Sequence, residues 1–241
     1  MKQLGGQGIY LNANDMQLGR GEPIKDTARV LSRYLDGIMI RTYKQSDLEE
    51  LAEYGSIPII NGLTDYVHPC QVLADLQTIR EHKGKLEGLK MCFIGAGNNM
   101  ANSLINGGIL AGMEVACACP LEYLPDEKIV ERAKATGRFI LTQDVLEAAK
   151  DADVLVTDVW ASMGEEGEAE TRKKIFGGKY QINDAVMEVA KPDAMVQHCL
   201  PAHREEEITE KVFEAHADEI FDEAENRLHA QKAVLVRLLG E

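Results

Sequence analysis

Short apolar runs alternate with amphipathic segments along almost the whole chain. Several runs are continuously apolar, which is typical of strands buried on both faces of a parallel sheet. Between them lie segments with helical spacing, such as Ile24–Leu35. This alternation predicts an α/β fold with parallel sheets and right-handed crossovers. The expected strands are Gly8–Leu11, Gly37–Arg41, Pro58–Asn61, Lys90–Ile94, Glu114–Ala118, Phe139–Thr142, Val154–Thr157, Ala194–His198 and Glu219–Phe221.

Local signals mark the starts of several helices. The run Ser46-Asp-Leu-Glu49 has the pattern of a capping box, in which both side chains bond backbone N–H groups, and it predicts a short helix. Pro69 stands where a helix beginning after His68 has its first residue, a position at which the missing N–H of proline costs nothing. The last expected helix is Ala224–Leu239, which is apolar along one side.

The order of these elements predicts two Rossmann-like, doubly wound domains with parallel sheets. Residues 81–223 contain a complete set of strands and helices. Residues 1–80 supply only three strands and begin with the pattern of a helix end, so we expect this first domain to be N-terminally incomplete. We expect the helix 224–241 to return and complete it.

Composition narrows the choice of function. The 241 residues are 45% hydrophobic, enough for a sizeable core, and the net charge of −14 argues against nucleic acid or an anionic membrane as a partner. No apolar run is long enough to span a bilayer, and Met1 does not begin a signal-peptide pattern. The five cysteines lack metal-ligand spacing, so we expect reduced thiols in a cytoplasmic protein without metal or cofactor.

Three expected strands end in polar side chains. Arg41 ends one strand, Asp158 follows Val154–Thr157, and Cys199 follows Ala194–His198. Parallel strands deliver such residues to the carboxyl edge of a sheet, where open α/β folds bind ligands. A lone cysteine is more often a structural core residue, and Asp158 alone would be an exposed strand-end cap. The three together favour a cleft, and we expect them to converge on one.

The run Gly95-Ala-Gly97-Asn-Asn-Met100 follows a strand and opens a helix, as a nucleotide-binding loop does. Met100 is too large for the third glycine position, and no acidic residue for a ribose ends the next strand. We therefore predict no dinucleotide site. Backbone N–H groups and an Asn amide at this helix start suit a carboxylate or zwitterion better, although one of the two asparagines fits a simple cap.

Eight motifs, in chain order, resemble ornithine carbamoyltransferase. Each is weak alone, but the ordered set is very specific. The resemblance implies transfer of the carbamoyl group of carbamoyl phosphate to the side-chain amine of ornithine, a carbamoyl-phosphate domain and an ornithine domain, and assembly as a trimer or multiples of it. The motifs are Leu18-Gly-Arg-Gly-Glu22, Asp26-Thr-Ala-Arg-Val-Leu31, Asn61-Gly-Leu-Thr-Asp65, His68-Pro-Cys-Gln71, Gly97-Asn-Asn99, Asp158-Val-Trp-Ala-Ser-Met-Gly164, His198-Cys-Leu-Pro201 and Glu223-Ala-Glu-Asn-Arg227.

The resemblance assigns site residues by position. It implies that Gln17 reaches the phosphate bound by a neighbouring subunit, and that Leu200 makes a backbone contact near the carbamoyl nitrogen. The remaining residues implied for carbamoyl phosphate are Arg41, His68, Gln71 and Arg227. Those implied for ornithine are Asn99, Asp158, Ser162, Met163 and Cys199.

The residue types suit this chemistry. The guanidinium of Arg41 is a fork for phosphate and carbonyl oxygen. His68 can donate to the carbonyl oxygen as charge develops there; it would read as a core or capping histidine if Gln71 were not one turn away. A carboxylate at Asp158 would hold the ornithine ammonium, and Cys199 would then help position the deprotonated amine, as thiol or as thiolate.

The sequence departs from the family pattern at two places. Ala96 stands where an acidic residue is usual, which predicts altered loop packing. A Ser-Thr-Arg-Thr phosphate loop, expected upstream of the position matching Lys2, does not occur in the chain. Because losing one donor to a developing anion costs roughly 10²- to 10³-fold in rate, we expect this chain alone to catalyse the reaction poorly.

Other functions stay open at this point. The chain would fit a non-catalytic ornithine-binding or assembly subunit, or a putrescine carbamoyltransferase. Asp158 and the Ser162-Met-Gly164 run favour a substrate with an α-ammonium group, and thus ornithine. A nicotinamide-dependent dehydrogenase would rest only on Gly95 and Gly97.

Overall fold

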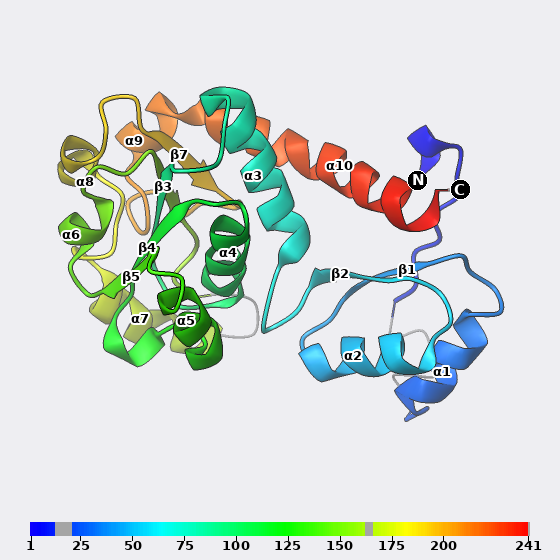
Figure 1. Cartoon of the computed structure of the whole chain (residues 1–241). Coiled ribbons are helices and arrows are strands. Elements are labelled where there is room, and N and C mark those ends of the chain that lie inside the picture. Colours follow the sequence, from blue (N-terminus) through cyan, green and yellow to red (C-terminus); the bar gives the residue numbers. More distant parts are fainter. Residues whose placement is uncertain (13–20, 162–165, 241) are drawn as a thin grey trace. The chain divides into compact units, whose positions relative to one another are not determined.

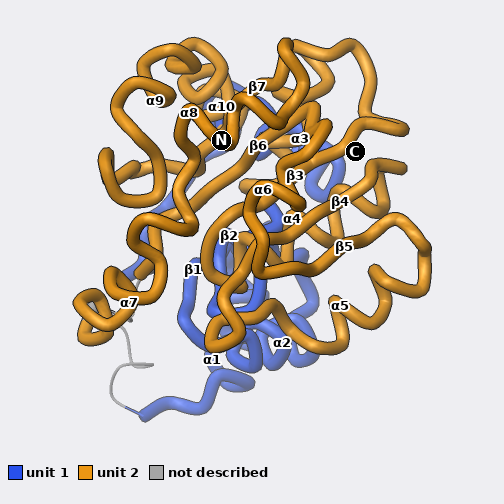
Figure 2. Tube along the Cα trace, turned by 90° about the vertical axis from the view of Figure 1, so that its left-hand side faces the viewer, with its two compact units in different colours: residues 1–70, 228–241 blue, residues 71–227 orange. Residues whose placement is uncertain are grey.

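The computed structural model describes residues 1–12, 21–161 and 166–240. Contacts divide the chain into two compact units, coloured separately in Figure 2. Unit 1 holds Met1–Cys70 and Leu228–Glu241, and unit 2 holds Gln71–Arg227. The domain limits predicted from the sequence, 1–80 and 81–223, stay a prediction, because the boundary of a compact unit and that of a domain need not fall at the same residue.

Unit 1 contains a two-stranded parallel sheet. Strand β1 (Ile38–Arg41) pairs with β2 (Ile59–Leu63), and helices α1 (Ile24–Leu31) and α2 (Gln45–Tyr54) lie together below this sheet in Figure 1. The pairing skips Gly62, so β2 bulges there; a side chain at this position would approach the carbonyl oxygen of Ile40 within 3.0 Å. The predicted strand Gly8–Leu11 is wrong, because these residues form no strand.

Unit 2 is a complete doubly wound domain. Its sheet is parallel throughout and has the strand order β5-β4-β3-β6-β7, so the winding reverses between β3 and β6. All five strands were predicted from their apolar runs. Their observed bounds are β3 Lys90–Ile94, β4 Glu114–Ala118, β5 Phe139–Thr142, β6 Val154–Thr157 and β7 Met195–His198.

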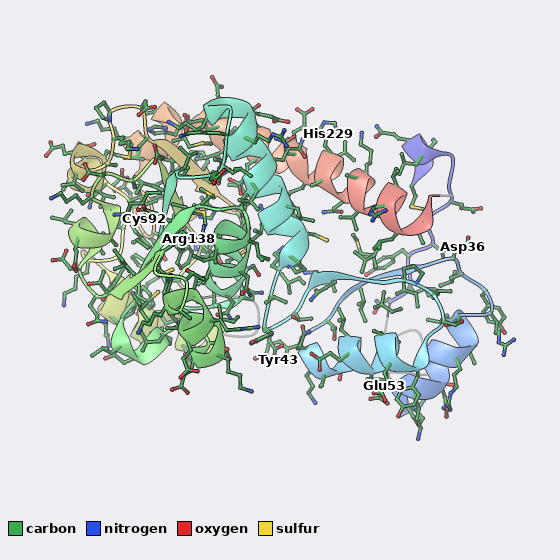
Figure 3. All side chains as sticks on the ribbon, viewed as in Figure 1. Asp36, Tyr43, Glu53, Cys92, Arg138 and His229 are labelled. Atoms are coloured by element: carbon green, nitrogen blue, oxygen red, sulfur yellow. The ribbon has the colours of Figure 1, made fainter. Side chains whose placement is uncertain are left out.

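Helices cover both faces of this sheet (Figure 1). On one face α4 (Asn99–Leu110) lies so close that a side chain at Gly108 would meet Met91 and Val115 at 2.8 and 2.7 Å. On the other face one apolar cluster joins Cys92 of the central strand to α6 (Val145–Ala149) and α8 (Asp184–Val189). Figure 3 shows the dense layer of side chains around the fully buried Cys92. The other helices of unit 2 are α3 (Pro69–Lys83, from Gln71 on), α5 (Glu127–Lys134), α7 (Ala169–Phe176), α9 (Glu210–Ala215) and the first part of α10 (Ala217–Leu239).

Helix starts follow the sequence signals in part. Helix α3 begins at Pro69, as predicted. The capping box at Ser46 is wrong: the N-cap of α2 is Lys44, two residues earlier, and its side chain makes no cap hydrogen bond. Gln45 instead uses its backbone N–H to bond Asp65, and its side chain accepts from Thr64. The loop after β2 therefore fixes the start of this helix.

The predicted strand Glu219–Phe221 is also wrong, because these residues lie in α10, which begins seven residues before the predicted start. Two carboxyl groups of this helix cover the sheet edge. Strand β7 is the last strand of the sheet, and its outward N–H groups at Val196 and His198 donate to Glu219 (2.8 Å) and Glu223 (2.9 Å). Carboxylates one helical turn apart thus replace a missing neighbour strand.

Candidate active site

Two predicted site residues meet at the carboxyl edge of the unit 2 sheet. Strands β6 and β7 are neighbours in register, with Thr157 opposite His198, so Asp158 and Cys199 follow side by side. The Cys199 thiol lies 3.1 Å from Oδ1 of Asp158. Asp158 is buried and Cys199 is half-buried. The strand-end argument therefore predicted this pair correctly.

Asp158 is held from three directions. Its Oδ1 accepts from the thiol of Cys199 and from its neighbour's backbone, Val159 N, at 2.8 Å. Its Oδ2 accepts from the side-chain amide of Asn98 at 2.8 Å. A carboxylate offers about four acceptor positions, so about one remains for the cation of a ligand.

Asn98 joins the start of α4 to this pair. Its side-chain oxygen accepts from Met100 N and Ala101 N (3.0 and 3.1 Å), while its amide donates to Asp158. Of the two asparagines expected here, Asn98 is the cap. Asn99, proposed for ornithine, is the half-buried first residue of α4.

Most backbone N–H groups of the glycine loop after β3 are bonded within the chain. The N–H groups of Gly95, Gly97 and Asn98 bond carbonyl oxygens of the chain, and those of Met100 and Ala101 bond Asn98. A side chain at Gly97 would lie 2.1 Å from the Leu124–Pro125 backbone, so this glycine is needed for packing. Met100 is buried in the core. These five N–H groups are therefore not available to a pyrophosphate.

The electrostatic surroundings of Cys199 favour the neutral thiol. Burial raises its pKa well above 9.0, and the charge of Asp158 raises it further. The more distant carboxyls of Glu223 and Asp75 act in the same direction. The raised pKa and the contact with Asp158 both fit a neutral thiol that donates a hydrogen bond to this carboxylate.

The backbone after Cys199 is fixed by His198. Leu200 adopts a left-handed conformation (φ 54°), which is unusual for a residue with a branched side chain. Its N–H donates to Nδ1 of His198 at 2.9 Å, so that nitrogen is the acceptor and Nε2 carries the ring proton. Nε2 in turn lies 3.0 Å from Oε1 of the fully buried Glu207. Sequence reasoning missed this role of His198 and Glu207.

A second polar cluster surrounds Gln71 on α3. Its amide nitrogen donates to Oδ1 of Asp75 (2.8 Å) and to Oε1 of Glu223 (2.9 Å), and all three side chains are buried. Burial raises the pKa of Asp75 to about 7, although its hydrogen bonds and the charge of Arg227 lower it in part. Burial, and next the charge of Asp75, raises the pKa of Glu223 well above 4.5. Gln71 and Arg227, both predicted for carbamoyl phosphate, therefore lie beside one buried pair of carboxyls whose pKa values are both raised.

Unit 1 carries the other predicted residues that the structure describes. Arg41 ends β1 and is exposed, and His68 is buried immediately before α3. Gln17, Ser162 and Met163 lie outside the described residues. Because Arg41 belongs to unit 1 and the Asp158–Cys199 pair to unit 2, their convergence on one cleft stays a prediction.

Trp160, two residues after Asp158, is held in place by an aromatic group. Trp160 stacks on Phe176 and donates its ring N–H to the carbonyl oxygen of Tyr180 at 3.1 Å. The buried Arg172 donates to the carbonyl oxygen of Trp160 at 2.8 Å and lies 4.2 Å from the centre of the Tyr123 ring. Arg172 was not predicted, because it looks like an ordinary surface residue of a charged helix.

Two family models match the chain, one for each part. Residues 1–81 match the carbamoyl-P binding domain of aspartate/ornithine carbamoyltransferase, and residues 87–238 match its Asp/Orn binding domain. The chain belongs to the aspartate/ornithine carbamoyltransferase family.

Individual family members agree over nearly all of the chain. The ornithine carbamoyltransferase of Carboxydothermus hydrogenoformans is 56% identical over 245 residues, which cover 100% of this chain and 78% of the relative. That of Thermococcus kodakarensis is 54% identical, over 99% of this chain and 77% of the relative. The solved structure of ornithine carbamoyltransferase from Pyrococcus furiosus is similar, with a TM-score of 0.93 and 53% identity, over 100% of this chain and 78% of that one.

One group in this family member has the composition of a metal site. Among the described residues, His203, Glu206 and Glu207 offer ligand atoms within 4.8 Å of one another. One oxygen of each carboxylate already has a partner: Oε1 of Glu206 pairs with Lys173 at 2.8 Å, and Oε1 of Glu207 accepts from the ring of His198 and the backbone of His203. We therefore assign no metal to it.

Proposed function

We propose that the protein transfers the carbamoyl group of carbamoyl phosphate to the side-chain amine of L-ornithine, giving L-citrulline and phosphate. The observation that carries this proposal is the Asp158–Cys199 pair at the sheet edge of the part that matches the family's Asp/Orn binding domain. A fixed carboxylate beside a thiol suits a substrate that brings an ammonium group close to a reacting amine.

The ornithine half of the site is proposed to work through Asp158. With Asn98, Val159 and Cys199 on its oxygens, the carboxylate cannot rotate, and its remaining acceptor position binds the substrate cation. The sulfur of Cys199 keeps its lone pairs and is a weak acceptor for an N–H of the neutral side-chain amine. Asn99, Ser162 and Met163 complete the proposed ornithine contacts.

The carbamoyl-phosphate half is proposed to use residues of both sequence regions. Arg41 binds phosphate and carbonyl oxygen, and His68 donates to the carbonyl oxygen as charge develops on it. The N–H of Leu200 is taken by His198, which leaves its carbonyl oxygen for the carbamoyl amine. The other proposed contacts are Gln71, Arg227 and, from a neighbouring subunit, Gln17.

The reaction then forms one bond and breaks another. The neutral amine nitrogen attacks the carbamoyl carbon, and the bond from that carbon to the phosphate oxygen breaks. Phosphate leaves with the bonding electrons and takes up the proton that the amine gives up. The enzyme's contribution is orientation and the stabilisation of negative charge on the carbonyl and phosphate oxygens.

The setting of this reaction is also part of the proposal. We expect a homotrimer or a multiple of trimers in the cytoplasm. A site that borrows Gln17 from a neighbour supports the trimer, and no helix in the described parts of the chain is long and apolar enough to cross a membrane.

A citrulline assay tests the function. Purified protein is incubated with carbamoyl phosphate and either ornithine or putrescine, and the carbamoylated product is measured against the Asp158→Asn variant. We expect citrulline above the level of this variant and little product from putrescine. Ornithine binding in a calorimeter without citrulline would instead support an ornithine-binding subunit, and failure of both would reject the proposal.

A further inference from the structure

The buried acid pair of Asp75 and Glu223 has no part in the proposed reaction, although it lies among residues proposed to bind substrate. Gln71 and Asp75 are one turn apart on α3, and Glu223 reaches them from α10. Both carboxyls are buried, with exposures of 0% and 1%. Burying two acids costs folding free energy unless they are well paired and hydrogen-bonded, so the question is what their hydrogen bonds hold in place.

The pair determines which way the Gln71 amide points. Its nitrogen has two N–H donors, and both are used, one by Asp75 and the other by Glu223. The opposite orientation would place the amide oxygen against two carboxyls, which repel it. The amide oxygen is therefore directed away from the acids, and within the described residues this buried atom has no hydrogen-bond partner.

Glu223 also touches the strand that carries Cys199. Its second oxygen, Oε2, accepts the N–H of His198 at 2.9 Å. One carboxyl group thus joins α3, α10 and the end of β7. Asp75 is tied to the same strand through its backbone carbonyl, which accepts from the Gln197 amide at 3.0 Å.

We propose that Glu223, with Asp75 as its partner, is a positioning residue that locks Gln71 with its amide oxygen toward the substrate and in register with His198 and Cys199. The inference rests on the proposed function, because it takes Gln71 to contact the carbamoyl group. An amide oxygen turned away from the acids would accept from the carbamoyl NH₂ and would not accept from a methyl group. Glu223 therefore acts on recognition of the carbamoyl amine without touching it.

One shared proton keeps the pair together. Asp75 Oδ2 is buried and receives no N–H donor from the described residues, so a proton held between the two acids satisfies it. The raised pKa of both groups agrees with this. Two charged or titratable groups lie close enough to interact with the pair. Arg227 on α10 lowers the pKa of Asp75, and the thiol of Cys199 has its pKa raised by both acids.

Glu219 offers a matched control. It lies one turn before Glu223 on α10 and also bonds the edge of β7, because its Oε2 accepts the N–H of Val196. The variant Glu219→Gln keeps an oxygen for that N–H. In the wild type both carboxyl oxygens of Glu223 are acceptors. In Glu223→Gln the new NH₂ group must therefore face either the N–H donor of Gln71 or that of His198.

Binding of two stable phosphonates tests the proposal without turnover. Phosphonoacetamide carries the carbamoyl amine, and acetonylphosphonate has a methyl group in its place. By calorimetry we expect the full chain to prefer phosphonoacetamide, Glu223→Gln to lose about 10-fold in affinity for it, and Glu219→Gln to change by less than about twofold. In a Gln71→Ala background the effect of Glu223→Gln should disappear.

A pH series gives a second readout. Affinity for phosphonoacetamide should fall as pH rises and the pair loses its shared proton, and Asp75→Asn, whose amide proton cannot be lost, should remove that part of the fall. Equal effects of Glu223→Gln and Glu219→Gln, an unchanged effect in the Gln71→Ala background, an unchanged pH profile in Asp75→Asn, or no preference of the wild type for phosphonoacetamide would each overturn the proposal. Citrulline formation by the wild type is measured in parallel and reports on the proposed function alone.

Discussion

The thiol of Cys199 donates a hydrogen bond to Oδ1 of Asp158 across 3.1 Å, at the ends of two neighbouring parallel strands. The same contact that orients the carboxylate discourages ionisation of the thiol, because burial and the adjacent charge both raise its pKa. Cys199 is therefore poorly suited to act as a nucleophile. The fixed carboxylate agrees with the proposed role of Asp158 in holding the substrate cation.

This arrangement predicts that Cys199 reacts slowly with alkylating reagents. Replacing Asp158 by Asn removes a charge that raises the thiol pKa, so the pKa should fall and alkylation by iodoacetamide at pH 8 should accelerate about 10-fold. Mass spectrometry of the peptide that contains Cys199 measures the rate. The deeply buried Cys92 of the same sample is the control, and an unchanged rate at Cys199 would show that the carboxylate does not govern it.

The two ends of the Asn98 amide have separable tasks. Asn98→Ser keeps an oxygen that can cap α4 but loses the donor to Asp158, so ornithine affinity should fall about 5- to 10-fold with little loss of stability. Asn98→Asp keeps the cap oxygen and places a second negative charge beside Asp158. This variant should change the substrate affinity and its pH dependence more than Asn98→Ser does.

Asn183 provides the comparison, because it caps α8 in the same way, through the N–H groups of Ala185 and Val186. Asn183→Ala should cost about 1 kcal/mol of unfolding free energy and leave ornithine affinity unchanged. Asn98→Ala should show a similar loss of stability together with weaker ornithine binding. Calorimetry and urea unfolding measure the two effects, and equal ornithine affinity in both alanine variants would refute the link to Asp158.

The sequence alone predicted those elements that follow from a regular pattern of apolar residues. Continuous apolar runs located β3 to β7, and the end of a parallel strand is a predictable place, so Asp158 and Cys199 could be paired in advance. Glu219-Ile-Phe221 failed because three residues do not distinguish a strand from a helical turn. The buried clusters around Asp75 and Glu207 could not be predicted for another reason. Whether a carboxyl is buried and paired depends on residues far away in the chain, as the bond between Gln71 and Glu223 shows.

Arg172 should matter through the segment that follows Asp158. Arg172→Lys keeps the charge but loses the planar group that donates to Trp160 and covers Tyr123, so we expect a loss of about 1–3 kcal/mol in unfolding free energy and a higher KM for ornithine. The neighbouring Lys173, whose ion pair with Glu206 is exposed, is the control, and Lys173→Gln should leave both quantities unchanged. A normal KM in a destabilised Arg172→Lys variant would limit Arg172 to a structural role.

The buried acid pair should leave a signature in the pH dependence of stability. The folded-state pKa of Asp75 is about 7 against 3.8 for the ordinary group, so the folded protein binds more protons than the unfolded chain between these values. The contribution of this group to stability is thus fully present below pH 3.8 and is lost as pH rises toward 7, and the raised pKa of Glu223 has the same sign. Asp75→Asn removes the titration. Urea unfolding at pH 5 and pH 8 should therefore show the wild type losing unfolding free energy relative to Asp75→Asn as pH rises, because two ionised acids share a buried site in which Arg227 offsets only part of the charge. No relative change between pH 5 and pH 8 would mean that the pair is already ionised in the folded protein at pH 5.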